Sequence, residues 1–282
     1  MQRCKFVCVA MLATIAACGP TATGGMNQVD GGGGGGGGGG DGGGNGYLVY
    51  AHSDTVLYSI DLMTQGLVTV GSFNAPNNDT MTDLAVAPDG TIYTISETAL
   101  YTVSATNGQA TQVASLATCG SFGVALTTTS DGRLWMGDYS GNICQIDISQ
   151  SPPVVKAPIT MQSGIALTGD MVGIDGGTVF GSAYKIADKN GGTQINNLLV
   201  KVDVTTGAVT QVGSTGYPEL FGVAAAQNEI FGFTHDGTGR VVTIDTATGA
   251  GTLFGTFTDP STHKGISFAG AGVNSQVVVV IQ

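Results

Sequence analysis

Positively charged side chains are scarce in this chain. Its 282 residues include nine Lys and Arg against twenty Asp and Glu, and the formal net charge is −11 at pH 7. Nucleic acids and anionic lipid surfaces are bound through clustered Lys and Arg that neutralise phosphate groups. We therefore expect the protein to bind no nucleic acid, and we expect no electrostatic attraction to a lipid surface.

Helical patterns are also lacking. Charged residues make up only 10% of the chain, whereas about a quarter is usual in globular proteins. No stretch combines apolar residues at helical spacing with a run of Ala, Leu, Glu and Lys, so we predict no helix. Gly, Thr and Val are abundant instead. Low charge with many β-branched residues is typical of sheets that are packed on both faces.

Residues 1–18 have the order of a bacterial export signal. Two basic residues precede an apolar run at 7–15, which is shorter than the roughly 20 residues that a permanent membrane helix needs. The run ends in the sequence IAAC at 15–18, which resembles the lipobox of bacterial lipoproteins. The resemblance implies that Cys18 is acylated and anchors the protein outside the cytoplasm, and Gly19 after it implies the outer membrane. An ordinary secretory signal is the alternative.

A glycine-rich segment follows at 19–46. Ten consecutive glycines occupy 31–40, and such a composition cannot bury enough apolar surface to fold. A flexible coil of this length spans roughly 30 Å, so we expect a tether that holds a domain at 47–282 clear of a membrane. A phosphate-binding loop would need a preceding strand and a following Lys-Ser/Thr pair, and neither is present here.

The segment at 82–116 contains four short runs rich in β-branched and aromatic residues. Turn sequences separate them, among them Pro88-Asp89-Gly90 and Asn107-Gly108. Asp-Gly and Asn-Gly favour hairpins because Gly, and to a lesser degree Asn, tolerates the positive φ that such turns need. Four antiparallel strands of about this length form one blade of a β-propeller.

Further copies of this pattern fill the domain. Their opening strands begin at residues 83, 123, 164, 222 and 265. These openings predict an all-β fold, a β-propeller with five four-stranded antiparallel blades, and six blades, two of them partial, are the alternative. In the five-bladed arrangement we expect the strand Gly265–Phe268 to close the ring by completing the sheet begun at Tyr47.

The repeats resemble those of bacterial extracytoplasmic propellers of the quinoprotein-like and YVTN-like kind. The shared elements are the patterns LYSID at 57–61 and DGTIY at 89–93, together with Thr-Gly turns. The resemblance covers 47–282 and implies the propeller fold. Such propellers include enzymes, scaffolds and binding modules, so the resemblance assigns no activity.

Candidate catalytic residues are few. His52, His235 and His263 lie in different copies without metal-ligand spacing, and we expect His52 to be a packed histidine. Metal-dependent lactonase propellers gather carboxylates and Asn in the central channel, for which Asp79, Asp83 and Glu219 are candidates. Only Asp83 falls in an opening strand, and one carboxylate does not make a metal site. We therefore assign no catalytic residue and expect no cofactor.

A polar insertion at 184–197 interrupts the fourth copy. Within it, Asp188 and Asn190 give a weak resemblance to a calcium-binding loop, but the segment lacks the third and the distal acidic ligands of such loops. Insertions in repeat proteins map to loops on one face, often the binding face. We expect this insertion to project from one rim and to contribute to partner binding, and a tolerated surface loop is the alternative.

Cys119 and Cys144 are the cysteines that remain after Cys18. An even pair in an oxidising compartment favours a disulfide. The repeat alignment, however, places them near the first and third strands of one blade, roughly 10 Å apart. That exceeds the limit of about 7 Å between bridged Cα atoms unless the loop folds over the end of the blade. The sequence leaves both states open.

Two functional hypotheses remain. The lipobox, the tether and the lack of converging catalytic groups favour a membrane-anchored binding or scaffold module for an unknown protein, glycan or small-molecule ligand. A propeller hydrolase or lactonase-type enzyme with a site at the central channel is the alternative, and it rests on analogy of fold. Three or more carboxylate or His side chains at one mouth of the channel would favour the enzyme.

Overall fold

The structure is a computed structural model that describes residues 48–120, 122–162, 164–174, 177–186 and 198–273. These residues belong to one compact unit, Gly39–Gln282. The export signal with Cys18, the glycine-rich segment, and the Asp188 and Asn190 candidates lie outside the described residues.

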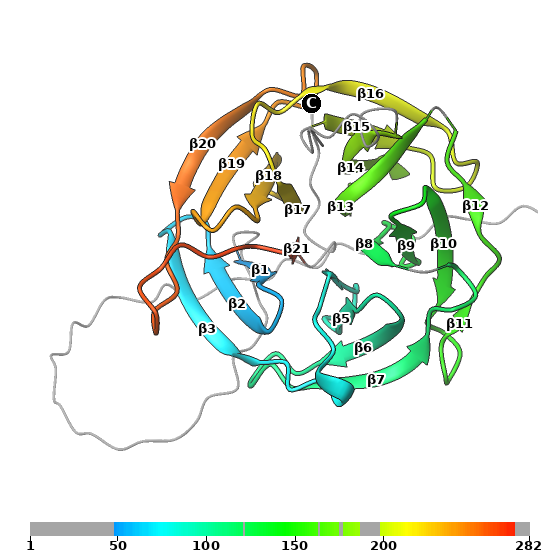
Figure 1. The fold of residues 1–282 in the computed structure, drawn as a ribbon, viewed down its shortest axis with the longest axis horizontal. Helices are drawn as coiled ribbons and strands as arrows, with labels where there is room; N and C mark the ends of the chain where they lie inside the picture. The colour runs from blue at the N-terminus through cyan, green and yellow to red at the C-terminus, as the bar shows by residue number, and fades with distance from the viewer. Residues whose placement is uncertain (1–47, 121, 163, 175–176, 187–197, 274–282) are drawn as a thin grey trace, which may run out of the picture. The chain divides into compact units, whose positions relative to one another are not determined.

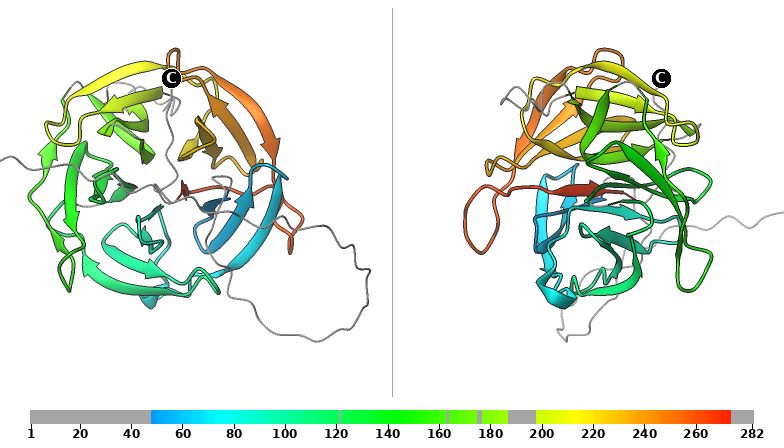
Figure 2. Two further views of the ribbon diagram at one scale, coloured as in Figure 1. Left: turned by 180° about the vertical axis from the view of Figure 1, so that it is seen from behind. Right: turned by 45° about the vertical axis from the view of Figure 1, so that its right-hand side comes forward.

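Five antiparallel sheets form blades around a central axis (Figures 1 and 2), which confirms the five-bladed propeller. The strands of each blade follow, from the innermost to the outermost. Blade 1 contains β21 (Gly270–Gly272), β1 (Leu48–His52), β2 (Val56–Asp61) and β3 (Gly66–Ser72). Blade 2 contains β4 (Asp83–Val86), β5 (Ile92–Ile95), β6 (Ala99–Val103) and β7 (Ala110–Ser115). Blade 3 contains β8 (Gly123–Thr128), β9 (Leu134–Asp138), β10 (Asn142–Asp147) and an outer strand divided into β11 (Val154–Val155) and β12 (Ile159–Thr160). Blade 4 contains β13 (Ile165–Gly173), β14 (Val179–Lys185), β15 (Leu198–Val202) and β16 (Val209–Ser214). Blade 5 contains β17 (Leu220–Ala226), β18 (Glu229–Thr234), β19 (Arg240–Ile244) and β20 (Gly251–Thr256).

The ring is closed by a strand other than the expected one. β21 pairs with β1, so that Tyr50 lies opposite Gly272. The expectation that Gly265–Phe268 forms this strand is therefore wrong. Within the described part of the chain, Gly265 forms an isolated bridge to Thr258 and belongs to no strand. The closing strand consists of Gly, Ala and Gly because the axis is crowded: a Cβ on Gly270 would lie 2.2 Å from Asp83 Oδ1. Such a strand has little β-propensity to reveal it in the sequence.

The core consists of five apolar clusters, one between each pair of neighbouring blades. Between blades 5 and 1, for example, Phe233 packs edge-on against Phe268 at 5.4 Å between ring centroids. The inner strands of each sheet are thus buried on both faces, which explains why the chain has few charges, whereas the outermost strands β3, β7, β16 and β20 are mostly exposed or half-buried.

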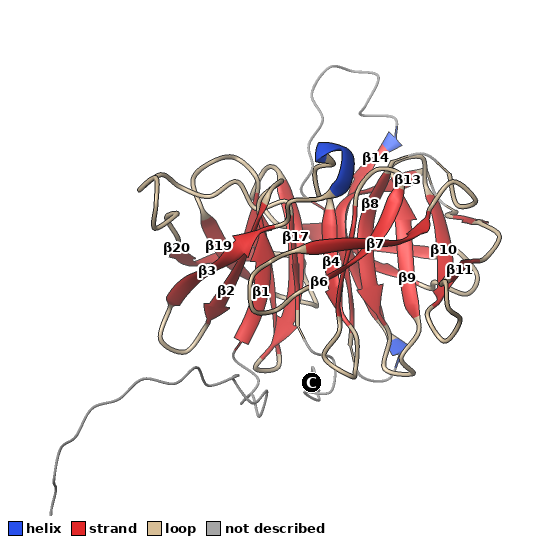
Figure 3. Ribbon diagram, turned by 90° about the horizontal axis from the view of Figure 1, so that it is seen from below, coloured by secondary structure: helices blue, strands red, loops and turns tan. Residues whose placement is uncertain are grey.

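The ring has two faces formed by different turns. The turn between β1 and β2 and the link that contains the 3₁₀ helix η1 (Pro76–Asn78) lie on what we call the upper face, at the top of Figure 3. The hairpins between the third and fourth strands lie on the lower face. Because β1 leads up to the β1–β2 turn, the described chain enters at Leu48 on the lower face.

The recurring Asp residues after the third strands serve the hairpin turns. Asp61 Oδ1 accepts hydrogen bonds from the N–H groups of Met63 and Thr64. Asp203 and Asp245 make equivalent bonds two and three residues further on. These carboxylates are satisfied by the backbone, as Asx turns require. Among the described residues, no helix is long and apolar enough to cross a membrane.

Cys119 and Cys144 are joined by a disulfide, with 5.8 Å between their Cα atoms. Cys144 lies in β10, and Cys119 lies in a turn where its N–H donates to the carbonyl of Leu116 at 2.9 Å. This turn folds over the end of the blade. The distance between the two cysteines is therefore shorter than the distance between the first and third strands of the blade.

Candidate functional site

A cleft of about 600 Å³ opens at the centre of the upper face. All five blades contribute to its wall, through residues before or within the innermost strands and through the turns between the second and third strands. The volume lies within the range of 300–1,000 Å³ that is typical of small-molecule sites. Three aromatic side chains dominate the lining: Phe122, Tyr139 and Phe221.

Phe122 is held in a strained conformation at this cleft. Its φ is +71°, in the left-handed region that bulky residues avoid, and its side chain is 51% exposed. Two backbone hydrogen bonds fix it. The N–H of Phe122 donates to the carbonyl of Glu97, and the carbonyl of Phe122 accepts from the N–H of Tyr139. An exposed aromatic ring gains little from burial, so the strain points to a function for its position.

Phe221 and His235 form the opposite part of the wall. Their rings stack at 4.8 Å between centroids with an interplanar angle of 15°. His235 lies in the turn after β18, where its N–H donates to the carbonyl of Glu219 at 2.8 Å. Its Nε2 lies 3.5 Å from Asp54 Oδ1. The hydrogen bond with His235 is the main cause that lowers the pKa of Asp54, so this carboxyl is ionised at neutral pH.

Two buried carboxyl groups, Asp83 and Asp170, lie at the axis next to cleft residues Thr82 and Gly169. Burial raises the pKa of both well above the ordinary value, and for Asp83 the charge of Asp170 raises it further. Asp170 Oδ1 has no hydrogen-bond partner among the described protein atoms. A proton on Asp83 that is directed toward Asp170 would satisfy this oxygen, so we infer that the pair holds a proton at neutral pH.

His52 is fully buried beside this pair, as expected of a packed histidine. Its Nδ1 lies 2.9 Å from the carbonyl of Ser53, and burial lowers its pKa to about 4. Its Nε2 has no partner among the described atoms and, like Asp83 Oδ1, faces Gly270. The imidazole is therefore neutral at physiological pH and closed off by the ring-closing strand.

The remaining candidates from the sequence do not converge. Asp79 accepts hydrogen bonds from Ser96 and from the hydroxyl of Tyr101. Glu219 contributes its backbone carbonyl to His235, and His263 is exposed in a turn after β20. In the described part of the chain, no three His, Cys, Asp or Glu side chains are arranged to hold a metal ion.

Sequence reasoning missed Asp170 and the aromatic wall. Asp170 lies in a bulge of β13 between Leu167 and Met171, and bulges redirect side chains in ways that a repeat alignment does not reveal. Phe122 and Phe221 did leave a signal. Each is followed by Gly-Val-Ala at the start of an innermost strand, as FGVA at 122–125 and at 221–224.

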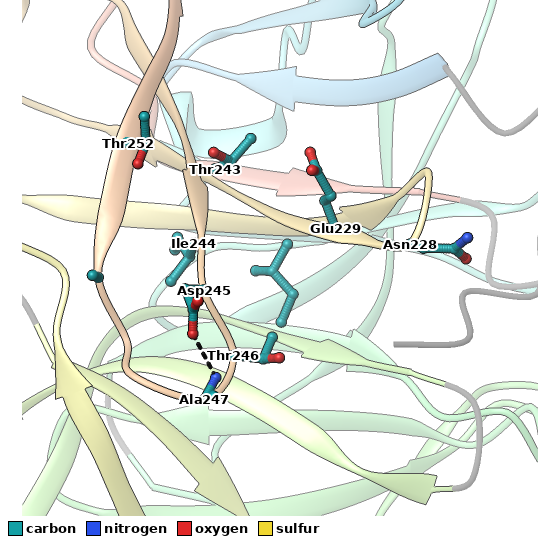
Figure 4. Close-up of a pocket in the computed structure, with 10 residues that line it drawn as sticks. Asn228, Glu229, Thr243, Ile244, Asp245, Thr246, Ala247 and Thr252 are labelled. Carbon is teal, nitrogen blue, oxygen red and sulfur yellow. Dashed lines mark hydrogen bonds between the residues drawn. The ribbon is translucent and has the colours of Figure 1, made fainter. Parts of the chain in front are cut away.

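A second cleft, of about 670 Å³, lies on the lower face at blade 5. Figure 4 shows its lining, in which Asp245 accepts a hydrogen bond from the N–H of Ala247. The labelled residues come from hairpin turns and strand ends, among them Glu229 and Thr243, and none is aromatic. Asp245 is therefore engaged in its own turn, and the lining of this cleft contains no aromatic side chain among the described residues.

No family model matches the chain, and no curated protein matches it. Similar solved structures include virginiamycin B lyase from Staphylococcus aureus, with 11% identity, a TM-score of 0.44, and coverage of 74% of this chain and 66% of the lyase. Hydrazine synthase from Kuenenia stuttgartiensis has 16% identity and a TM-score of 0.43, with 61% of this chain and 47% of that one covered. A protein of unknown function from Bacteroides caccae has 11% identity and a TM-score of 0.43, with 80% and 97% covered. The class of the protein follows from its own five four-stranded sheets, which define a five-bladed β-propeller.

Proposed function

We propose that this protein is a ligand-binding propeller whose central cleft on the upper face receives a small molecule or the terminal group of a longer one. The observation that carries the proposal is Phe122, whose exposed ring lines the cleft at a φ of +71°. Backbone strain that burial does not explain is found at binding sites, where the surrounding structure maintains it. Phe221 and Tyr139 add aromatic surface to the same cleft, and such surface suits a ligand with a flat or compact apolar part.

The proposal is tested by screening a chemically mixed fragment library with ligand-observed saturation-transfer NMR. Fragments that bind the wild-type chain should lose their signal with Phe122→Ala and with Phe221→Ala. Leu253→Ala is the matched control, because Leu253 is equally exposed, at 51%, but lies on the outer strand β20. If the fragments bind the Phe122→Ala variant as well as the wild type, the central cleft is not the binding site.

We further propose that the protein is a lipoprotein of the outer membrane, anchored through acylated Cys18. The lipobox-like sequence at 15–18 and the glycine-rich segment support this, and a disulfide between Cys119 and Cys144 suits an oxidising compartment. Acyl chains contribute about 0.8 kcal/mol per buried CH₂ group. In a Triton X-114 partition of bacterial cells the wild type should enter the detergent phase, and Cys18→Ser should enter the aqueous phase. Equal partition of the two would contradict the anchor.

An enzymatic function is the second candidate, and one observation favours it. Asp54 can orient the imidazole of His235 through Nε2, which leaves Nδ1 as a base at the wall of the cleft. A hydrolytic activity on a panel of esters and lactones, abolished by His235→Gln while fragment binding persists, would support the enzyme. An activity unaffected by His235→Gln would exclude this residue as its base.

A further inference from the structure

The described lining of the central cleft contains a carboxylate and no Lys or Arg. Among the described residues, the ionisable side chains that line it are those of Asp54, His235 and Tyr139. Asp54 carries its negative charge at neutral pH because its pKa is lowered by the hydrogen bond with His235. Arg240, which begins β19 on the same face, is paired with Asp236. An anionic ligand would therefore find no free Lys or Arg among the described residues of this lining.

The aromatic side chains of the cleft also favour a positively charged ligand. The face of an aromatic ring attracts cations, by about 0.5–1 kcal/mol at exposed sites and about 2 kcal/mol when the cation is desolvated. Phe122 contributes a ring that is 51% exposed. One face of the Phe221 ring is covered by His235, and the ring still lines the cleft. Tyr139 belongs to the same lining and packs against Tyr184 at 5.3 Å between centroids.

The electrostatic potential of the whole chain also favours a positively charged ligand. The formal net charge is −11, and a potential of that sign raises the local concentration of cations around the molecule.

We infer that the ligand of the central cleft carries a positive charge on a compact apolar body, as alkylammonium groups do. The inference rests on the proposed function and specifies the ligand class of the same site. In this arrangement the aromatic rings contact the apolar body of the cation. Asp54 Oδ1 lies 3.5 Å from His235 Nε2, and the other carboxylate oxygen of this exposed side chain neutralises the charge of the ligand from the rim.

The inference is tested with three probes of nearly equal shape and different charge. Choline is the cation, 3,3-dimethylbutan-1-ol is its neutral carbon isostere, and 3,3-dimethylbutanoate is the anion. Binding is measured by saturation-transfer NMR on the full chain. We expect choline to bind about tenfold more tightly than the neutral isostere, with no binding of the anion. Choline affinity should also fall between 20 mM and 500 mM salt.

Three variants locate the effect. Asp54→Asn should lower the affinity for choline about tenfold and leave the affinity for the neutral isostere unchanged. Phe122→Ala should lower the affinity for both. Glu229→Gln is the matched control, because it removes a carboxylate from the lower cleft and should change neither.

Every other outcome contradicts the inference, and one of them also contradicts the proposed function. If the neutral or anionic probe binds as tightly as choline and its binding depends on Phe122, the charge preference is wrong and the proposed function stands. If choline binds but Glu229→Gln abolishes the binding and Phe122→Ala does not, both are wrong. If no probe binds at 50 mM, the inference is wrong, and the fragment screen alone decides the proposed function.

Discussion

Asp83 and Asp170 together connect the innermost strands of all five blades. Asp83, at the start of β4, accepts hydrogen bonds from its neighbour Leu84 and from Leu126 in β8. Asp170 Oδ2, from β13, accepts hydrogen bonds from Val223 in β17 at 2.7 Å and from Ala271 in β21 at 3.2 Å. Every innermost strand thus contributes a carboxyl group or an N–H to one buried pair. The pair therefore fixes the strands around the axis beneath the cleft.

This pair should make stability fall at alkaline pH. A carboxyl whose pKa is raised on folding contributes stability that is present below its unfolded pKa near 4 and is lost as the pH rises through its folded pKa. The pKa values of both groups are raised. The melting temperature should therefore decline from mildly acidic toward alkaline pH, as followed by circular dichroism. A melting temperature that stays constant over this range would contradict the shared proton.

Asp170→Asn should flatten this pH dependence without breaking the hydrogen bonds. An amide oxygen in place of Oδ2 can accept from Val223 and Ala271, and the amide nitrogen can donate to Asp83. Asp170→Ala is the contrasting variant. It leaves two buried N–H groups unpaired, at a cost of roughly 1–3 kcal/mol each. If both variants destabilise the protein equally, Asp170→Asn does not remove the charge while it keeps the hydrogen bonds, and the prediction is wrong.

Phe122→Asn should leave the fold as stable as the wild type or up to about 1 kcal/mol more stable. Asn tolerates the left-handed conformation that costs Phe free energy at a φ of +71°. The same substitution should abolish binding at the cleft, because the exposed ring is lost. Urea unfolding measures the first effect, and NMR with a fragment that binds the wild type measures the second. A clear loss of stability would mean that the ring serves packing and not recognition.

Gly270→Ala should destabilise the ring strongly, by about 3 kcal/mol or more. The added Cβ would lie 2.2 Å from Asp83 Oδ1 and 2.5 Å from His52 Nε2, both of them buried. Gly255→Ala, in strand β20, is the control, since its Cβ meets nothing closer than Gln65 Oε1 at 3.4 Å. Thermal unfolding of both variants checks the prediction, and similar melting temperatures would contradict it.

Reduction of the disulfide between Cys119 and Cys144 should lower the free energy of unfolding by roughly 3 kcal/mol. The bridge closes a loop with a sequence separation of 25, and a closed loop of that length restricts the unfolded chain by about this amount. Urea titrations with and without dithiothreitol measure the effect. The double variant Cys119→Ser and Cys144→Ser should resemble the reduced wild type and should not respond to dithiothreitol.

The blades could be predicted from the sequence because hairpin chemistry is local. Asp61, Asp203 and Asp245 cap their turns through residues two and three positions away, so the pattern is contained in each repeat. The closing strand could not be predicted, since Gly270 is required by the crowding of side chains from distant segments. Asp170 was missed for a similar reason, because a bulge turns it toward the axis.

The cleft was only partly visible in the sequence. The repeated FGVA at 122–125 and 221–224 marks the two phenylalanines. The FGVA motif does not predict that Phe122 adopts a positive φ and stays exposed, because its backbone partners Glu97 and Tyr139 belong to other turns. Likewise, the pairing of His235 with Asp54 joins blades 5 and 1, which meet only when the ring closes.

The described chain enters the ring at Leu48 on the lower face, while the cleft opens on the upper one. With a lipid anchor at Cys18, the attachment of the tether would leave the opening unobstructed, and many copies could share one membrane. A polymer that carries the recognised group repeatedly would then engage several copies at once. Its avidity would exceed the affinity of a single cleft by factors of about 10²–10⁴, so under this proposal a weak site would suffice to hold a large ligand at the membrane.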